Sequence, residues 1–194
     1  MKLKIGIIGG GIFGLAAALE LSKFCDVFVY ERNTDLLSEA TTNNMLRHHM
    51  GYHYPRSEET VREIQDSAPF FEEEFGDCIM KGFPAYYSVS KIDSMSTGKQ
   101  FLEFCKRNKL PHEIVNPPDW LIDKNKIELC VKTPEAVYDP EILKEILKRK
   151  IEQSKNIMVF LDHEVIGGKK QGAQKILLIN NKTKSKKIEE QFDI

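Results

Sequence analysis

A glycine pattern near the start of the chain constrains the fold more than any other feature. Residues 5–8 form a short apolar run that predicts a strand, and residues 15–24 are rich in Ala and Leu, which favours a helix. Residues 27–30 are β-branched or aromatic and predict a second strand. The first strand and the helix are joined by three glycines spaced as GxGxxG, namely Gly9, Gly11 and Gly14. These parts together predict a βαβ unit with both strands in one parallel sheet.

The position of the glycines predicts a turn that binds a pyrophosphate. Gly9 would make the tight turn, Gly11 would let the backbone approach the phosphates, and Gly14 would let the helix pack on the strand. The N-terminus of the helix would stabilise the phosphate charge. The alternative is a glycine-rich turn without a ligand. A turn without a ligand would not explain why the strand, the glycines, the helix and the second strand all have the spacing of a dinucleotide-binding unit.

An acidic residue follows the second predicted strand. Glu31 is placed to accept hydrogen bonds from ribose hydroxyls, and its charge disfavours the 2′-phosphate of NADP. The glycine pattern by itself does not separate FAD from NAD. Its place at the beginning of the chain, and the sequence that follows it, favour FAD.

The composition argues against several classes of protein. The formal net charge is -1, so the chain lacks the basic field that nucleic acid attracts. We expect no signal peptide and no membrane span, because no apolar stretch is long enough. The four cysteines are scattered without a CxxC pair, which predicts reduced thiols and a cytoplasmic protein.

The rest of the chain alternates between predicted helices and strands. Residues 33–55 have no sustained period and predict a long loop, and a loop of that length usually carries a function. Two helices are expected at 57–75 and 99–109, and a third begins at Pro140. The expected strands are 83–91, 127–132, 157–161, 164–166 and 175–180, the last two in a small meander.

Two further stretches carry a resemblance to a known family. They are NMLRHHMGYHYPRS at 44–57 and EAVYDPEILKEILKRKI at 135–151. Together with residues 4–32, they resemble the D-amino-acid-oxidase-like family of FAD-dependent oxidoreductases. The spacing of Asn44, His49, Gly51, Tyr52 and Tyr54 is most similar to the branch that contains L-2-hydroxyglutarate oxidase. His53 interrupts the tyrosine pair of that branch.

The resemblance implies a set of FAD-binding residues. Gly9, Gly10, Gly11, Ile12, Phe13 and Gly14 would surround the pyrophosphate, and Glu31 with Arg32 would lie at the ribose. The flavin side would be formed by Thr41, Thr42, Leu46, Arg47 and His48. Val165 would reach the adenine through its backbone.

Candidate catalytic residues follow from the same histidine-rich stretch. A neutral histidine beside a flavin can take the proton of a substrate hydroxyl, and His49 is our candidate for that base, against the alternative of a structural loop histidine. Arg47 and Arg56 are candidates to pair with a substrate carboxylate, or are surface charges. We expect no metal, because His48, His49 and His53 have no Cys or acidic partner at ligand spacing.

The expected fold is α/β. A Rossmann-like FAD-binding domain would be formed by residues 1–80 and 139–194, with an inserted antiparallel α+β substrate domain at 81–138. The expected reaction is hydride transfer from the C–H of a 2-hydroxy acid or amino acid to FAD. The alternative is a non-catalytic dinucleotide-binding fragment, or one half of a split flavoenzyme.

The end of the chain suggests an incomplete enzyme. Members of the resembled family continue with another strand and further substrate-domain sheet. Residues 192–194 are expected to open that strand, so we expect the C-terminal half to be missing or supplied by a partner chain.

Overall fold

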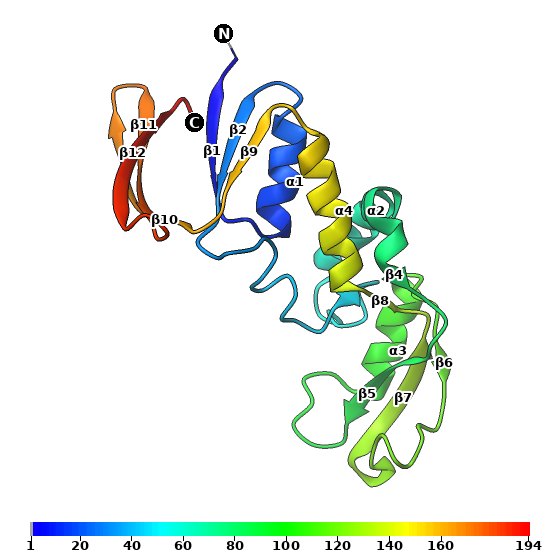
Figure 1. Cartoon of the computed structure of the whole chain (residues 1–194). Helices are drawn as coiled ribbons and strands as arrows, with labels where there is room; N and C mark the ends of the chain where they lie inside the picture. Colours follow the sequence, from blue (N-terminus) through cyan, green and yellow to red (C-terminus); the bar gives the residue numbers. More distant parts are fainter. Residues whose placement is uncertain (1) are drawn as a thin grey trace. The chain divides into compact units, whose positions relative to one another are not determined.

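The predicted βαβ unit is present in the computed structural model, which describes residues 2–194. β1 (Lys4–Ile8) and β2 (Asp26–Tyr30) pair in parallel, and α1 (Ile12–Leu21) connects them. β9 (Ile157–Phe160) pairs in parallel with the other edge of β2, so the sheet order is β1-β2-β9 (Figure 1). α4 (Pro140–Gln153) lies beside α1 and buries four apolar residues, Leu143, Ile146, Leu147 and Ile151.

An antiparallel meander follows β9 and packs on the same sheet. It consists of β10 (His163–Gln171), β11 (Gln174–Asn181) and β12 (Lys186–Phe192). The buried Phe192 ring lies 5.7 Å from the Phe28 ring and 6.0 Å from the Tyr30 ring, measured between centroids. Phe28 and Tyr30 alternate with Val27 and Val29 along β2, so the opposite face of the sheet remains for α1.

The strand at 186–192 corrects one sequence prediction. We expected residues 192–194 to open a new strand. Instead, Phe192 ends β12, because Ile188 and Phe192 point inward while the charged residues between them stay at the surface. Asp193 and Ile194 then bond to β1, through Asp193 N to Lys4 O at 2.9 Å and Gly6 N to Ile194 O at 3.2 Å.

A second compact unit is formed by residues Leu46–Asp139. Its larger sheet is antiparallel, with order β5-β7-β6, from β5 (Ala85–Ser90), β7 (Ile127–Thr133) and β6 (Glu113–Ile114). Its smaller sheet has order β3-β8-β4, from β3 (Arg47–His48), β8 (Ala136–Tyr138) and β4 (Ile79–Met80). The helices are α2 (Glu58–Phe75), α3 (Gly98–Arg107) and the short 3-10 turns Gly76–Cys78 and Lys124–Lys126.

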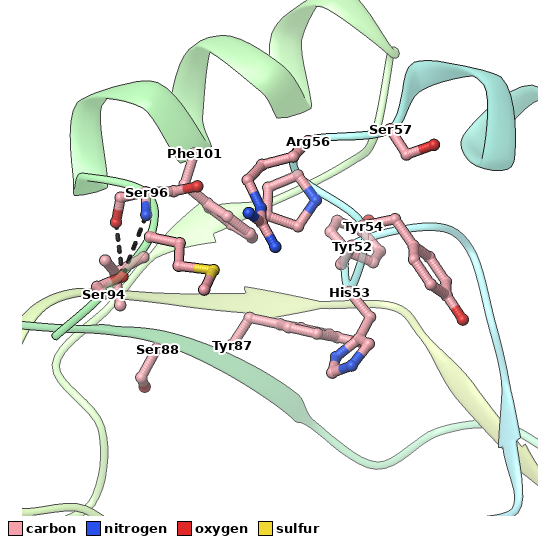
Figure 2. A pocket seen from close by; sticks show the side chains of 13 residues that line it. Tyr52, His53, Tyr54, Arg56, Ser57, Tyr87, Ser88, Ser94, Ser96 and Phe101 are labelled. Carbon is pink, nitrogen blue, oxygen red and sulfur yellow. Dashed lines mark hydrogen bonds between the residues drawn. The ribbon is translucent and has the colours of Figure 1, made fainter.

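The core of this unit is aromatic. The rings of Tyr52, Tyr87 and Phe101 come together from the loop before α2, from β5 and from α3 (Figure 2). The Tyr52 and Tyr87 centroids are 5.3 Å apart, and those of Tyr87 and Phe101 are 6.4 Å apart. Tyr87 therefore helps to fill the core, as expected of an aromatic residue at strand spacing.

The compact units share one boundary with the predicted domains, near residue 139, and differ at the other. Unit 1 takes in the chain up to Met45 together with Pro140–Ile194, and unit 2 is Leu46–Asp139, whereas the predicted boundary lies at residue 80. The segment 46–80 folds with unit 2 because β3 and β4 both pair with β8. The contacts of residues 46–48 with FAD stay a prediction.

Candidate functional site

The three glycines of the turn in unit 1 meet different surroundings. Gly9 has a φ of +100°, which side chains rarely adopt. A Cβ on Gly14 would lie 2.0 Å from the carbonyl oxygen of Gly9, so the helix could not pack on the turn. A Cβ on Gly11 would meet only Thr41 Oγ1, at an ordinary contact distance of 3.6 Å. The fold thus requires Gly9 and Gly14, whereas the space beside Gly11 is open, as a pyrophosphate cradle demands.

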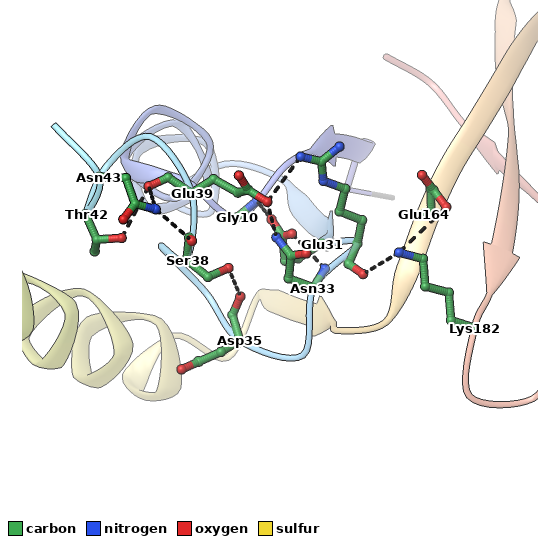
Figure 3. A network of polar contacts seen from close by, with 11 residues as sticks. Gly10, Glu31, Asn33, Asp35, Ser38, Glu39, Thr42, Asn43, Glu164 and Lys182 are labelled. Atoms are coloured by element: carbon green, nitrogen blue, oxygen red, sulfur yellow. Dashed lines mark hydrogen bonds and ion pairs between the residues drawn. The ribbon is translucent and has the colours of Figure 1, made fainter.

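Glu31 holds the glycine turn in place. Its side chain is largely buried, and Oε2 accepts a hydrogen bond from Gly10 N at 2.7 Å while Oε1 accepts one from Asn33 N at 2.8 Å (Figure 3). A carboxylate has about four acceptor positions, so both oxygens retain capacity for ribose hydroxyls. The ribose role of Glu31 stays a prediction, and its bond to the glycine turn was not predicted from the sequence.

The N-terminus of α1 is open to an anion. Gly11 is the N-cap and supplies no side chain, and the first turn of α1 carries no acidic residue. Ile12 N donates to Thr41 Oγ1 at 3.2 Å, so Thr41 braces this end of the helix, whereas Thr42 Oγ1 donates to Leu37 O at 2.9 Å within the loop. The predicted Phe13 side chain is 90% exposed, so it does not cover the helix end. Backbone amides and the helix dipole favour a phosphate at a helix N-terminus.

The other predicted residues of unit 1 surround Glu31. Arg32 Nη2 lies 3.2 Å from Glu39 Oε1, and its carbonyl accepts from Lys182 Nζ at 3.1 Å (Figure 3). His163 N donates to Glu31 O at 2.9 Å, which brings the start of β10 beside the acid. Val165 follows on β10 and packs on the buried Tyr30 cluster. The predicted cofactor-binding residues of unit 1 therefore lie in the glycine turn, at the start of α1, at the end of β2 with the loop after it, and in β10, and their contacts with FAD stay a prediction.

In unit 2 the predicted residues 46–48 are held by short-strand pairing. Leu46 has a φ of +52°, and its carbonyl accepts a hydrogen bond from Tyr138 N at 2.8 Å. His48 Nε2 lies 2.9 Å from Glu72 Oε1, and its ring stacks on Phe71 with 5.5 Å between centroids. The hydrogen bond from His48 lowers the pKa of Glu72. These contacts engage the His48 side chain inside unit 2, and its flavin role stays a prediction.

A buried carboxylate that the sequence analysis missed organises the candidate catalytic residues. The Glu135 side chain is 2% exposed, and Oε1 accepts from Met50 N at 2.9 Å. Oε2 accepts a hydrogen bond from the Tyr87 hydroxyl. Arg47 Nη1 lies 4.0 Å from Oε2 and donates to the Tyr87 hydroxyl at 2.9 Å.

His49 lies on the other side of the same carboxylate. Its Nδ1 is 3.8 Å from Glu135 Oε1 and, among residues 2–194, this buried nitrogen has no hydrogen-bond partner. Burial opposes ionisation of Glu135, but the interactions with His49, Tyr87 and Met50 outweigh it, so its pKa is lowered. Glu135 is thus an anion that faces both candidate catalytic side chains. Its only signal in the sequence is an acid set between two apolar runs.

A cavity of about 500 Å³ opens beside these histidines. His48, His49 and Met50 line it together with apolar side chains, including Ile64, Ala68, Pro69 and Leu110. Its volume lies within the range of small-molecule sites. Neither Arg47 nor Arg56, the two predicted carboxylate partners, is among its lining residues.

Three findings concern metal ligands, apolar helices and cysteines. In the part of the chain that the structure describes, no three His, Cys, Asp or Glu residues gather as a metal site. No helix within residues 2–194 has the length and apolar character to cross a membrane. Each of the four cysteines is buried and free.

The chain is similar to known FAD-dependent proteins. Residues 4–188 match the DAO family, described as FAD dependent oxidoreductase. The FAD-dependent monooxygenase kojA of Aspergillus flavus is 32% identical over 95 residues, which are 48% of this chain and 22% of that protein. The fold is similar to glycine oxidase from Geobacillus kaustophilus, with a TM-score of 0.73 and 14% identity, over 93% of this chain and 52% of that chain.

A second solved structure carries the cofactor. It is the L-alpha-glycerophosphate oxidase of Mycoplasma pneumoniae with FAD bound, with a TM-score of 0.72, 18% identity, and coverage of 94% of this chain and 51% of that chain. The chain spans about half the length of the solved structures that it resembles. The predicted α/β, Rossmann-like fold is confirmed by these likenesses. Because the family match extends over residues 4–188, the chain belongs to the DAO family of FAD dependent oxidoreductases.

Proposed function

We propose that the chain is the FAD-binding portion of an oxidoreductase that acts on the C–H of a 2-hydroxy acid or an amino acid. The observation that carries the cofactor part is the space beside Gly11. A side chain there would meet one atom at 3.6 Å, so the fold does not need this glycine, whereas a bound pyrophosphate does. Glu31 supports ribose binding, since it is anchored through Gly10 and keeps acceptor capacity.

Two residues of the chain would have separate roles in the reaction. Arg47 would bind the substrate carboxylate, and His49 would take the proton of the substrate hydroxyl or ammonium group at Nε2. When bound, FAD would supply the acceptor for the hydride of the substrate C–H, and oxygen or another electron acceptor would reoxidise it. With the proton on His49, a hydroxyl substrate would become a carbonyl compound and an ammonium substrate an iminium ion.

Glu135 supports these roles as a positioning residue. Because it faces His49 Nδ1, it favours the tautomer that carries the proton on Nδ1 and leaves Nε2 free as a base. Its bond from the Tyr87 hydroxyl, which also accepts from Arg47, restrains the guanidinium. The cavity beside His49 supports access for a small molecule.

Narrower assignments extend this proposal. The spacing of Asn44, His49 and Gly51 supports the branch that contains L-2-hydroxyglutarate oxidase, and hence a 2-hydroxy acid. Four buried, unpaired cysteines support a reducing, cytoplasmic setting. Residues 46–48 and Val165 complete the proposed FAD contacts.

A second candidate function rests on the length of the match. The chain covers 52% of glycine oxidase, so it would serve as a non-catalytic nucleotide-binding fragment or as one half of a split flavoenzyme with a partner chain. Proximity and orientation supply much of an enzyme's rate, so half of a pocket would lose most of it.

The two candidates differ in a direct experiment. The purified chain is titrated with FAD, NAD and NADP, and is then assayed with a panel of 2-hydroxy acids and amino acids and a dye acceptor. FAD binding with flavin-dependent turnover supports the enzyme, and FAD binding without turnover supports the fragment. Absence of FAD binding, or preference for NADP, contradicts both.

A further inference from the structure

A second cavity of unit 2 lies apart from the one beside His49. It has a volume of about 590 Å³, within the range of small-molecule sites. The two cavities share no lining residue. Neither Arg47, His49 nor Glu135 lines it, so the proposed reaction does not account for it.

Aromatic and polar side chains line the cavity. Tyr52 is fully buried and Phe101 is 4% exposed, and both pack against Tyr87, which lies between them (Figure 2). The Tyr52 hydroxyl donates to Pro111 O and the Tyr87 hydroxyl to Glu135, so neither ring can turn away freely. Tyr87 is half-buried and is the one of these three rings that a ligand can contact, and a fixed aromatic ring favours a planar or apolar ligand.

The charge of the cavity is positive. No Asp or Glu is among its lining residues, and Arg56 is the permanent cation among them. Within residues 2–194, Arg56 has no hydrogen-bond or ion-pair partner, and in Figure 2 its guanidinium points toward the space between Phe101 and Tyr87. An arginine without a partner is ready to take a carboxylate through two parallel hydrogen bonds.

The neighbouring charges favour a carboxylate over a phosphate. Ser57 lines the cavity and caps α2, and the next two residues, Glu58 and Glu59, are acidic. These acids would repel a dianion more strongly than a monoanion. The Ser57 hydroxyl is already used by Thr60, and that of Ser94 by Ser96.

We propose that this cavity binds a monocarboxylate with a flat apolar body, with Arg56 on the carboxylate and the half-buried ring of Tyr87 against the body. Binding needs neither flavin nor His49. It therefore holds or fails independently of the proposed function.

The test is a titration of the full 194-residue chain with phenylacetate, followed by backbone amide chemical shifts. Saturable shifts are expected at residues 52–57, 87–89 and 94–96. Phenylacetamide has the ring without the charge, and acetate has the charge without the ring, so each should bind at least about tenfold more weakly than phenylacetate.

Matched variants assign the charge. Arg56→Gln should weaken phenylacetate binding by about tenfold or more, the scale of a lost charge-assisted hydrogen bond. Arg56→Lys keeps the charge without the planar fork and should fall between. Arg62→Gln removes an equal charge from a side chain of α2 that is 72% exposed and does not line the cavity, and it should bind like the wild type.

Three results would overturn the proposal. They are the absence of saturable binding, shifts confined to other residues, and equal affinity in Arg56→Gln and the wild type. Tighter binding of phenyl phosphate than of phenylacetate would also overturn it, because a phosphate ligand would then replace the carboxylate.

Discussion

Unit 1 and unit 2 each hold a buried carboxylate that accepts a hydrogen bond from a backbone amide. The two carboxylates differ in how far along the sequence their hydrogen-bond donors lie. Glu31 accepts from Gly10 and Asn33, which are 21 and 2 residues away. Glu135 accepts from Met50 and Tyr87, which are 85 and 48 residues away. The glycine turn and Glu31 of unit 1 lie within one βαβ unit and can be recognised as a sequence motif. The residues around Glu135 in unit 2 come from distant segments, which the folded sheets bring together.

The largest expected effect separates ligand binding from folding. Gly11→Val should abolish FAD retention, a loss of about 3 kcal/mol or more, because its side chain would occupy the cradle. The fold should change by only about 0.5 kcal/mol, since a Cβ there meets only Thr41 Oγ1, at 3.6 Å. Flavin absorbance per mole of protein and thermal unfolding measure the two effects. Full flavin content in this variant would show that the glycine turn does not bind FAD.

The next effect acts on the fold. Gly14→Ala should destabilise unit 1 by about 3 kcal/mol, because its Cβ would lie 2.0 Å from the Gly9 carbonyl oxygen. Gly76→Ala is the matched control, since no atom lies within 4 Å of a Cβ built there. Urea unfolding compares the variants. Equal stability of the two would mean that the helix does not pack on the turn as described.

The ribose contact should respond more moderately. Glu31→Ala should weaken FAD binding by about 1 to 3 kcal/mol, and should also lower stability because Gly10 N and Asn33 N lose their acceptors. Glu39→Ala removes an exposed acid that pairs with Arg32 and should change FAD affinity by about 0.5 kcal/mol at most. Calorimetric titration with FAD measures both. Unchanged affinity in Glu31→Ala would remove Glu31 from the site.

The Glu135 cluster can be tested without the cofactor. Glu135→Gln should cost about 1 to 2 kcal/mol of stability and shift neutral His49 away from the tautomer with the proton on Nδ1. Long-range ¹H–¹⁵N spectra of the imidazole report the tautomer, which a purely structural role would leave unchanged. Glu72→Gln, at the partner of His48, is the control and should leave His49 as it is. An unaltered His49 tautomer in Glu135→Gln would rule out the positioning role.

The smallest expected effect concerns the exposed ion pairs of unit 1. Lys144 and then Lys148, each 2.6 Å from a carboxylate oxygen of Asp35, hold the pKa of Asp35 at about 2, below its ordinary value of 3.8. A lowered pKa in the folded state stabilises the fold above the unfolded pKa, and this contribution is lost as the pH falls from 3.8 toward 2.

The Asp35 carboxylate is 38% exposed, so solvent screening limits the contribution to about 0.5 to 1 kcal/mol. Asp35→Asn should thus be less stable than the wild type at about pH 7 and equal to it at about pH 2. Urea unfolding at both pH values measures the difference. A constant difference across this range would show that the carboxylate charge is not the cause.

Local patterns predicted the elements of the fold well, and long-range packing decided where the predictions failed. Ser57 accepts a hydrogen bond from Thr60 N at the start of α2, and Thr97 with Gln100 forms a capping box at α3, so both helices begin close to the predicted residues. β12 was not predicted because its charged and polar residues outnumber Ile188 and Phe192. Only the packing against β2 shows that these two side chains belong to the core of unit 1.

The sequence by itself determined the βαβ unit, the glycine turn and the acid at the end of β2, because each depends on neighbours a few residues away or on the period of a strand or helix. It also indicated the family, through motifs at residues 4–32, 44–57 and 135–151, and the family match over residues 4–188 confirms it. Only the tertiary structure decided that Glu31 bonds to Gly10, that segment 46–80 folds with unit 2, and that Glu135 faces both Arg47 and His49. These contacts join residues that are far apart in the sequence, so no helix or strand period predicts them. A carboxylate can be buried only where hydrogen-bond donors surround it, and the sequence does not show which distant donors will do so.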